Sequence, residues 1–431
     1  MKKIIKNVDV LPMTEEGLVL RDAVVVIEGH TIKYVGAAEG LEAGWAAAEE
    51  IDGAGMLLLP GFINAHTHAA MTLLRSYADD LPLMQWLQER IWPLEEKLTA
   101  EDVYWGTKLC ILEMIKSGTT TFADMYFFME DVARAVEETG IRACLSRGMI
   151  GVAPTGLQAL VESEALIEKW QEGADGRITV MLGPHAPYTC PPDYLEKVMA
   201  LAEKYKVGIH IHLSETLQEN NDIRKMYGKS PVAHLNDLGL FEYPVLAAHC
   251  VHVSPEDIKI LQAKKVGVAH NPESNMKLAS GIAPVPEMLA AGVAVGLGTD
   301  GAASNNNLDM LEEMRSAALL HKVNKMDPTT IPSYKALEMA TTGSAQVVGL
   351  GDQVGKIAPG YKADMILINT EKAHLYPKHD YFAHIVYAAQ SSDVDTVIIN
   401  GSIVMRGREM TCCDEKEVLR QAQRCAERLI G

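Results

Sequence analysis

His66 and His68 stand one residue apart in the stretch FINAHTH (residues 62–68), directly after an apolar run and a Pro-Gly turn. Side chains at positions i and i+2 of a strand point to the same face of a sheet. Two imidazoles side by side at the end of a buried strand would repel each other when protonated and lack partners when neutral, unless something bridges them. The pair therefore indicates either two metal ligands or two hydrogen-bonded core histidines.

Histidines and carboxylates also follow several later β-rich runs of the chain. They are His185 after ITVMLGP, His210, His212 and Glu215 in VGIHIHLSE, His249 and His252 in VLAAHCVHV, His270 in VGVAH, and Asp300 in GLGTDG. If these runs are the parallel strands of one barrel, their carboxyl ends meet at a common mouth. The two opening histidines would then be part of a convergent site.

The alternation of β-rich and amphipathic segments supports such a barrel. Eight strands are predicted, at residues 56–68, 118–125, 141–151, 178–187, 207–215, 245–253, 266–274 and 293–304. Helices are predicted between them, one over about 100–117 with Thr99 as its N-cap and another opened by Ser254 and Pro255. Eight consecutive β–α units predict an α/β fold of the (β/α)8 TIM-barrel type. A doubly wound sheet is the alternative, but it would not by itself place polar residues after nearly every strand.

Composition is typical of a soluble enzyme acting on a small molecule. The 431 residues include 48% hydrophobic residues and carry a formal charge of -18, which disfavours binding to nucleic acid. The seven cysteines include no CxxC pair, which favours a reducing compartment. The start of the chain has the pattern of a strand, and no apolar run approaches the ~20 residues of a membrane span. We therefore expect a cytoplasmic protein with no membrane partner. The sequence does not decide whether the protein is a homo-oligomer.

One divalent metal ion would explain the polar residues at the mouth. A mononuclear zinc site takes three or four nitrogen and oxygen ligands, and His66, His68, His212 and Asp300 fit that requirement. Zinc is the first expectation, although the same donors also suit iron(II) or manganese(II). His210, His252 and His270 are expected to be structural.

Two neighbouring residues are expected to handle protons at this site. A metal ion can lower the pKa of a bound water to ~7, which supplies a nucleophile at neutral pH. Glu215 would donate a proton to a ring nitrogen of the substrate, and His249 together with Asp300 would accept the proton of the attacking water. Glu215 could instead be only an acid interacting with the dipole at a helix start.

The motifs PGFINAHTH, HIHLSE, AAHCVH and GTDGAASNNNLDM resemble, in this order, those of the amidohydrolase superfamily. The resemblance implies a small β-sandwich built from both termini, so that residues 1–57 and 351–431 (with a terminal helix) would flank a barrel over 58–350. Within the superfamily, the stretches around residues 66–98, GPHAPYT and HLSET resemble the 5'-methylthioadenosine/S-adenosylhomocysteine deaminases. That similarity implies hydrolytic deamination of adenine in 5'-methylthioadenosine, S-adenosylhomocysteine or adenosine, giving the inosine analogue and ammonia.

The same resemblance implies substrate contacts. Trp86 would pack against the nucleoside, Glu95 would hold the ribose hydroxyls, and His185 would contact a purine nitrogen. Ser304 would lie near the base, and Arg147 would face the thioether or amino-acid end. The sequence departs from the family pattern at the amino-acid end of the substrate, where family members that take S-adenosylhomocysteine well are expected to offer a second arginine. The chain has no arginine between Arg147 and Arg177, which favours methylthioadenosine or adenosine over S-adenosylhomocysteine.

The sequence also leaves two other functions as alternatives. The scaffold could act on another nitrogen heterocycle, by deaminating guanine or cytosine or by dechlorinating a triazine. It could also be a non-catalytic barrel, although the presence of all the expected ligands and of Glu215 argues against that function.

Overall fold

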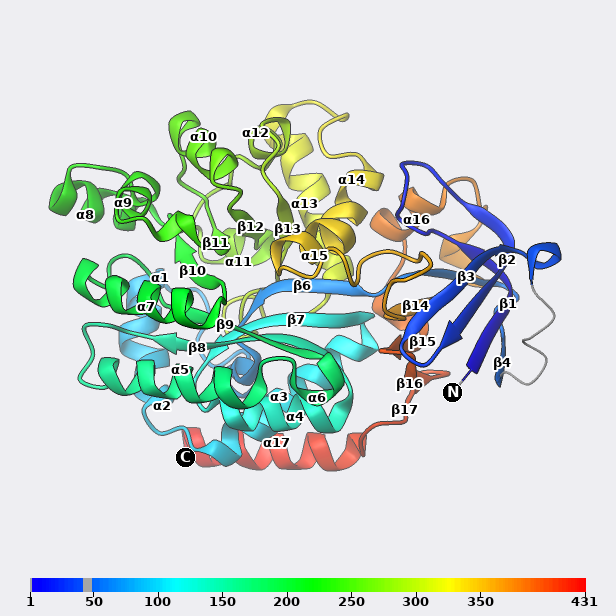
Figure 1. Cartoon of the computed structure of the whole chain (residues 1–431), viewed down its shortest axis with the longest axis horizontal. Coiled ribbons are helices and arrows are strands. Elements are labelled where there is room, and N and C mark those ends of the chain that lie inside the picture. Colours follow the sequence, from blue (N-terminus) through cyan, green and yellow to red (C-terminus); the bar gives the residue numbers. More distant parts are fainter. Residues whose placement is uncertain (1, 42–48) are drawn as a thin grey trace.

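The computed structural model describes residues 2–41 and 49–431, and its larger part is a parallel barrel (Figure 1). The eight strands of the barrel are β6 (Phe62–Thr67), β7 (Thr119–Tyr126), β8 (Arg142–Met149), β9 (Ile178–Pro184), β10 (Ile209–Leu213), β11 (Val245–His249), β12 (Gly267–His270) and β13 (Val295–Leu297). They are hydrogen-bonded in sequence order from β6 to β13. Between the two ends of this sheet, the Asp300 N–H donates to the His66 carbonyl at 3.0 Å. The predicted (β/α)8 fold is confirmed.

Helices surround the barrel and follow the predicted alternation. They are α1 (Leu83–Trp86), α2 (Trp92–Glu95), α3 (Ala100–Lys116), α4 (Met129–Thr139), α5 (Gly156–Trp170), α6 (Gly173–Gly176), α7 (Pro192–Tyr205), α8 (Leu217–Tyr227), α9 (Pro231–Asp237), α10 (Pro255–Ala263), α11 (Pro272–Lys277), α12 (Val285–Ala290), α13 (Met310–Lys325), α14 (Ser333–Glu338), α15 (Ser344–Val347), α16 (Tyr381–Tyr387) and α17 (Glu415–Ile430). Helix α3 begins as predicted, because Thr99 and Asp102 form a capping box. Ser254 and Asp257 cap α10 in the same way.

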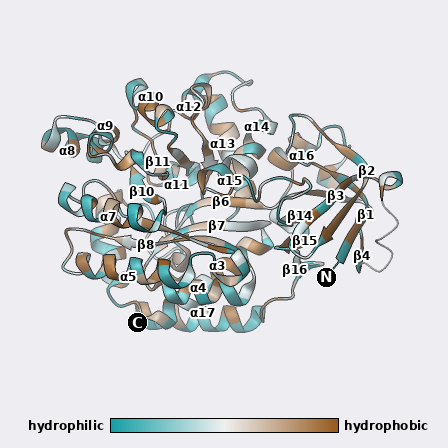
Figure 2. Cartoon of the chain, in the orientation of Figure 1, coloured by the Kyte–Doolittle hydropathy of each residue, from teal (hydrophilic) through white to brown (hydrophobic). Residues whose placement is uncertain are grey.

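The strands of the barrel bury both of their faces, which is why apolar residues occur on both faces of a strand and do not alternate with exposed polar ones. On β8, Ala143 and Leu145 pack into the large outer cluster beneath the helices, whereas Cys144 belongs to a smaller cluster with residues of β6, β7 and α15. Figure 2 shows the outer helices with hydrophilic and hydrophobic stripes, as expected for helices with one face on the sheet. No helix among the described residues combines the length and the apolar composition needed to cross a bilayer.

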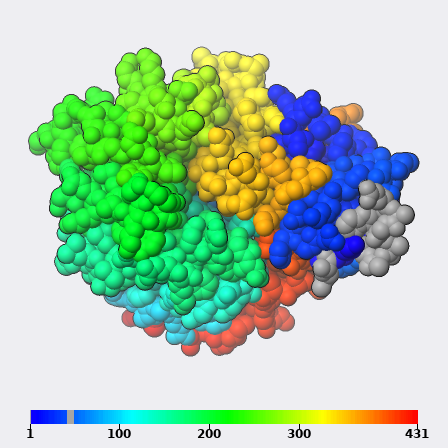
Figure 3. All heavy atoms as spheres, viewed as in Figure 1, coloured from blue at the N-terminus to red at the C-terminus, as the bar shows by residue number. Residues whose placement is uncertain are grey.

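Strands from both ends of the chain build a second sheet beside the barrel. Its members are β1 (Lys2–Val10), β2 (Leu20–Glu28), β3 (Thr31–Ala37), β4 (Glu49–Asp52), β5 (Met56–Pro60), β14 (Met365–Asn369), β15 (Val394–Ile399), β16 (Ser402–Arg406) and β17 (Glu409–Met410). They form one sheet, mostly antiparallel, with its own apolar core. Figure 3 shows the N-terminal segment in blue lying against the segment drawn in orange, in agreement with the 2.9 Å hydrogen bond from the Ile357 N–H to the Pro12 carbonyl.

The apolar run before the two histidines belongs to both sheets. Residues 56–68 were expected to form a single barrel strand, but β5 pairs with β1 and β14 in the terminal sheet, and β6 starts the barrel after Gly61. A Cβ atom at Gly61 would lie 2.1 Å from Cγ2 of Thr120, so only glycine lets the chain pass between the sheets at this point.

A buried ion pair joins the barrel to the terminal sheet. The Arg142 guanidinium on β8 donates from Nε to Oδ2 of Asp364 at 2.7 Å and from Nη2 to Oδ1 at 3.1 Å, and both side chains are 1% exposed. Asn400 and the carbonyl of Gly176 accept further bonds from the same guanidinium. Removing one partner would leave a buried charge without compensation.

Replacing Arg142 with Met is therefore expected to lower the free energy of unfolding by about 3 kcal/mol or more. Arg134, whose side chain is 52% exposed beside Asp131, offers the matched control, and Arg134→Met should cost within about 1 kcal/mol. Urea denaturation of the two variants measures the difference. Equal midpoints would show that the buried pair does not hold the two parts together.

Candidate metal and active site

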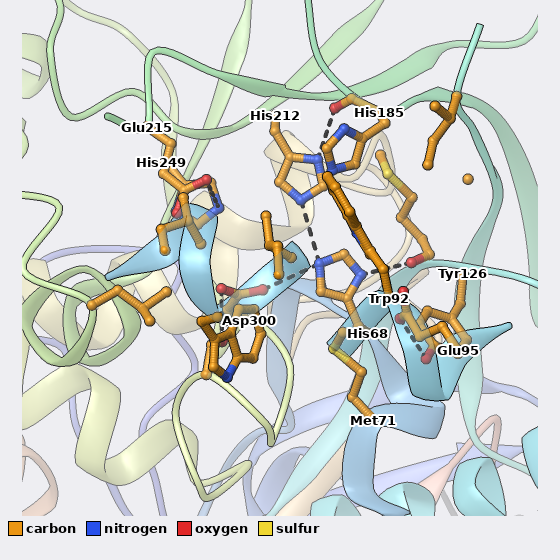
Figure 4. Close-up of a pocket in the computed structure, with 18 of the residues that line it drawn as sticks. His68, Met71, Trp92, Glu95, Tyr126, His185, His212, Glu215, His249 and Asp300 are labelled. Carbon is orange, nitrogen blue, oxygen red and sulfur yellow. Dashed lines mark hydrogen bonds and ion pairs between the residues drawn. The ribbon is translucent and has the colours of Figure 1, made fainter. Parts of the chain in front are cut away.

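Two imidazoles at the mouth of the barrel, those of His68 and His212, turn the same ring nitrogen toward each other (Figure 4). His68 Nδ1 is bonded to the Met125 carbonyl at 2.6 Å, and His212 Nδ1 to the His185 carbonyl at 2.8 Å. A carbonyl can only accept, so both Nδ1 atoms carry a proton, and in the neutral ring each Nε2 atom offers a lone pair. These two Nε2 atoms are 3.3 Å apart, which is the arrangement of two ligands of one cation.

His66 and Asp300 complete the cluster from the two ends of the barrel sheet. Oδ1 of Asp300 lies 3.2 Å from Nε2 of His68 and 3.5 Å from Nε2 of His66. The other carboxylate oxygen, Oδ2, accepts hydrogen bonds from Ser274 and Ser304 at 2.7 and 2.9 Å. Asp300 has a φ of 61°, a strained conformation for a residue with a side chain, which is typical of functional positions.

The residues at this point fit a divalent cation. Nε2 of His66 is buried without a hydrogen-bond partner, although its Nδ1 is bonded to His210 at 2.8 Å. Burial lowers the pKa of His66 to about 4. Burial also disfavours the charged form of His68, but the hydrogen bond to Asp300 and the charge of that carboxylate outweigh this effect and raise the pKa of His68 to about 9. A cation would take the place of the proton that Asp300 now attracts to His68.

The cluster contains two overlapping sets of three donor residues, and both sets include His66. Within each set, the donor atoms all lie within 4.8 Å of one another. One set adds His68 and Asp300, and the other adds His212 and His249. The four residues predicted as ligands are thus brought together, and His249 is a fifth donor that the sequence had placed beside the metal rather than on it.

His249 and Glu215 face each other on one side of this cluster. Nδ1 of His249 is bonded to Oδ1 of Asn275 at 2.9 Å, and its Nε2 lies 4.0 Å from Oε2 of Glu215. His249 has a φ of 74°, so the last residue of β11 is bent out of the strand conformation. Burial raises the pKa of Glu215 above its ordinary value, which favours the protonated form that an acid catalyst needs.

Glu219, in the first turn of α8, fixes the backbone that carries Glu215. Its carboxylate accepts the N–H groups of Ser214 and Glu215, each at 2.8 Å, and its side chain is buried. Ser214 has a φ of 52°, and the two hydrogen bonds hold this strained turn directly after β10. Glu219 was not predicted as a functional residue, although a carboxylate four residues beyond Glu215 at a helix start is a visible signal in the sequence.

We expect Glu219 to make stability depend on pH. Burial raises the pKa of Glu219 from its ordinary 4.5 to about 8, although the N–H groups of Ser214 and Glu215 favour the charged form. Between these values the folded chain keeps a proton that the unfolded chain releases, so the free energy of unfolding falls as pH rises, by at most ~1.4 kcal/mol per unit. Glu219→Gln should flatten this slope in urea denaturation across the window. A slope unchanged by the substitution would contradict the assignment.

Four of the five predicted substrate contacts line the pocket above the cluster, together with Glu215, His249 and Asp300. Trp86 is buried and donates from Nε1 to the Ala78 carbonyl at 2.9 Å, and Glu95 accepts the Tyr126 hydroxyl at 2.7 Å. Burial lowers the pKa of His185 to about 4, so its ring is neutral. Ser304 reaches the pocket but also donates to Asp300.

Arg147, the fifth predicted contact, does not line this pocket. Ser146 bonds to His210 inside the barrel, and strand alternation then turns Arg147 to the opposite side. There it lines a second cavity with Phe127, Phe128 and Glu162. The alternation along β8 is visible in the sequence and could have predicted this direction.

The three histidines expected to be structural have different surroundings. His210 is the hydrogen-bond partner of His66, so it orients a candidate ligand. Nε2 of His252 is bonded to the Ser280 carbonyl at 2.7 Å, and His270 lies 3.2 Å from His321. Neither His252 nor His270 lines the pocket.

The pocket also has an apolar wall that was not predicted from the sequence. It is made by Leu83, Leu87, Met125, Phe127, Tyr188 and Ile150. Single apolar or aromatic residues after a strand carry no signal that distinguishes a pocket wall from the core, so only the structure could assign them.

Comparison with known proteins shows the family to which the chain belongs. The family model described as "Amidohydrolase family" matches residues 57–404, which is most of the chain. The chain belongs to the amidohydrolase family. The resemblance found in the motifs is thereby confirmed.

Relatives narrow the position of this amidohydrolase within the family. It is 61% identical over 99% of both chains to a protein of Pelotomaculum thermopropionicum named 5-methylthioadenosine/S-adenosylhomocysteine deaminase. A protein of Syntrophomonas wolfei with the same name is 59% identical over the full length of both. Among solved structures, an adenosine deaminase from Xanthomonas campestris with bound zinc has a TM-score of 0.96 at 34% identity, with 99% of this chain and 98% of that chain covered.

Proposed function

We propose that the chain is a metal-dependent aminohydrolase that deaminates the adenine ring of 5'-methylthioadenosine, S-adenosylhomocysteine or adenosine, releasing ammonia and the inosine analogue. The observation that carries the proposal is the convergence of three imidazole Nε2 atoms and the Asp300 carboxylate beside a buried glutamate. The names of the relatives at 59–61% identity support the choice of substrate.

His66, His68, His212 and Asp300 would hold one divalent cation, and zinc is the proposed ion because these are nitrogen and oxygen donors of a type that zinc prefers. The zinc in the adenosine deaminase from Xanthomonas campestris supports this choice. When bound, the ion would lower the pKa of a water molecule at the site and so supply the nucleophile.

Proton transfer is assigned to the residues around the cluster. Glu215 in its protonated form would donate to N1 of the adenine ring as water attacks C6, because attack at C6 places negative charge on the ring. His249 and Asp300 would accept the proton of that water. The amino group must then leave as ammonia, and Glu215 or Asp300 would return the proton that it needs.

The pocket residues would orient the nucleoside. Trp86 offers an aromatic surface to the nucleoside, and Glu95 offers carboxylate oxygens to the ribose hydroxyls. His185 is neutral and can bond to a purine nitrogen, and Ser304 would lie near the base.

An assay panel tests the proposed function. Ultraviolet absorbance should show deamination of 5'-methylthioadenosine or adenosine at rates at least about a hundredfold above those of guanine, cytosine and a chlorotriazine, because a site that bonds the ribose rejects substrates without it. Turnover of a free base or triazine in preference to every nucleoside would replace the proposal with the alternative reaction. The cytoplasmic location and a homo-oligomeric state stay predictions.

A further inference from the structure

Arg147 lies near the carboxyl end of β8 and lines a cavity next to the candidate active-site pocket. Phe127 lines both the pocket and this cavity, and the Arg147 guanidinium stands over the Phe127 ring at 5.1 Å from its centroid. Gly148, the next residue of the chain, lines the pocket itself. A 5' substituent that leaves the pocket past Phe127 would therefore meet the Arg147 guanidinium. Among the described residues, Arg147 is the only cation that stands over the Phe127 ring.

Glu162 on α5 already forms an ion pair with the Arg147 guanidinium. Nε of Arg147 donates to Oε2 of Glu162 at 2.6 Å, and Nη1 donates to the Gly148 carbonyl. The Arg147 side chain is 12% exposed, whereas that of Glu162 is 43% exposed. The guanidinium is therefore largely buried in the cavity, and the Glu162 carboxylate can move away from it into solvent. Glu162 therefore neutralises the positive charge of Arg147 at the position where a substrate carboxylate would bind the guanidinium.

The other charges of the cavity do not restore a positive site. Glu130 is paired with Lys169 and accepts the Trp170 Nε1–H at 2.7 Å, and Asp131 is partnered by Arg134. The charged residues lining the cavity are therefore three acids, Glu130, Asp131 and Glu162, and two bases, Arg147 and Lys169. Because Arg134 partners Asp131, each of these acids is paired with a base, and no described cation lining the cavity is left unpaired for an incoming carboxylate. A methylthio group, by contrast, meets only the apolar wall of the pocket.

We propose that Glu162 is a specificity-determining residue that, by holding Arg147, selects uncharged 5' substituents over those that end in a carboxylate. The inference rests on the proposed function and narrows it, since S-adenosylhomocysteine carries such a carboxylate and 5'-methylthioadenosine does not. A substrate carboxylate must displace Glu162 before it can form the paired hydrogen bonds that a guanidinium offers.

Glu162→Gln tests the proposal on the metal-loaded full chain. The ratio of kcat/KM for S-adenosylhomocysteine to kcat/KM for 5'-methylthioadenosine should rise at least about fivefold, because release of a partly exposed ion pair is worth ~1 kcal/mol. The gain should disappear in the double variant Arg147→Met, Glu162→Gln. Glu130→Gln is the matched control, because it removes the same charge from the same cavity without a contact to Arg147, and its ratio should stay within about twofold of wild type.

The outcomes separate this proposal from the proposed function. An unchanged ratio in Glu162→Gln, with both nucleosides deaminated by the wild type, overturns the specificity proposal alone. A lower ratio also overturns it, because Glu162 would then bind the ammonium group of the amino-acid end. An equal rise in Glu130→Gln would assign the effect to the net charge of the cavity and not to Arg147. If the wild type deaminates neither nucleoside, the proposed function itself fails.

Discussion

Glu215→Gln is expected to lower kcat about a thousandfold while the protein keeps its metal ion. Glutamine has nearly the same shape as protonated glutamate and can still accept a hydrogen bond, but it cannot give a proton to the ring or to the departing amine. The side chain is buried 4.0 Å from Nε2 of His249, so no solvent acid can readily replace it. Steady-state kinetics and metal analysis on the same preparation measure the two quantities.

The pH profile adds a second readout for Glu215. Burial raises its pKa, and the acid form is the active one, so kcat/KM of the wild type should fall as pH rises through that pKa. Glu215→Gln should lack this alkaline limb. Glu256→Gln, at an exposed position of α10, is the control and should leave rate and profile unchanged. Loss of the metal together with activity in Glu215→Gln would mean that Glu215 is a ligand.

His68→Ala is expected to lose both the metal and the activity. His68 Nε2 lies within 3.3 Å of both Asp300 Oδ1 and His212 Nε2, so its removal takes one donor from the centre of the cluster. Without the cation the water at the site would keep its ordinary, much higher pKa, and kcat/KM should fall by on the order of 10⁴-fold. Metal content by elemental analysis and the rate of deamination check the two losses.

The control for His68→Ala is His379→Ala, because His379 is exposed in the loop between β14 and α16. That variant should retain metal and activity. A His68→Ala protein with full metal content would remove His68 from the ligand set, and His249 would then be the next candidate because it forms a donor set with His66 and His212.

Local signals made much of the fold predictable from sequence. The helix expected over about 100–117 occurs as α3, because Thr99 and Asp102 provide a capping box that fixes where it starts. The apolar run before His66 was harder, because its hydrophobicity continues through Gly61 while its hydrogen-bond partners change from one sheet to the other. The pattern of apolar residues reports burial but does not report which strand is the neighbour.

The site was predictable to the extent that it depends on strand ends. His66, His68, His212 and Asp300 meet because parallel strands of a barrel share one carboxyl end. Arg147 also stands at a strand end, but its side chain leaves on the other face, where it pairs with Glu162. Contacts from residues distant in sequence, such as Asn275 on His249, depend on how loops pack and left no pattern in the sequence.

Four side chains remote in sequence are proposed to share one divalent cation. Crystals of the zinc-loaded protein, measured on both sides of the zinc absorption edge, test it most directly. We expect one anomalous peak about 2.0–2.2 Å from Nε2 of His66, His68 and His212 and from a carboxylate oxygen of Asp300. A peak bound elsewhere, or two peaks that divide these residues between separate ions, would contradict it.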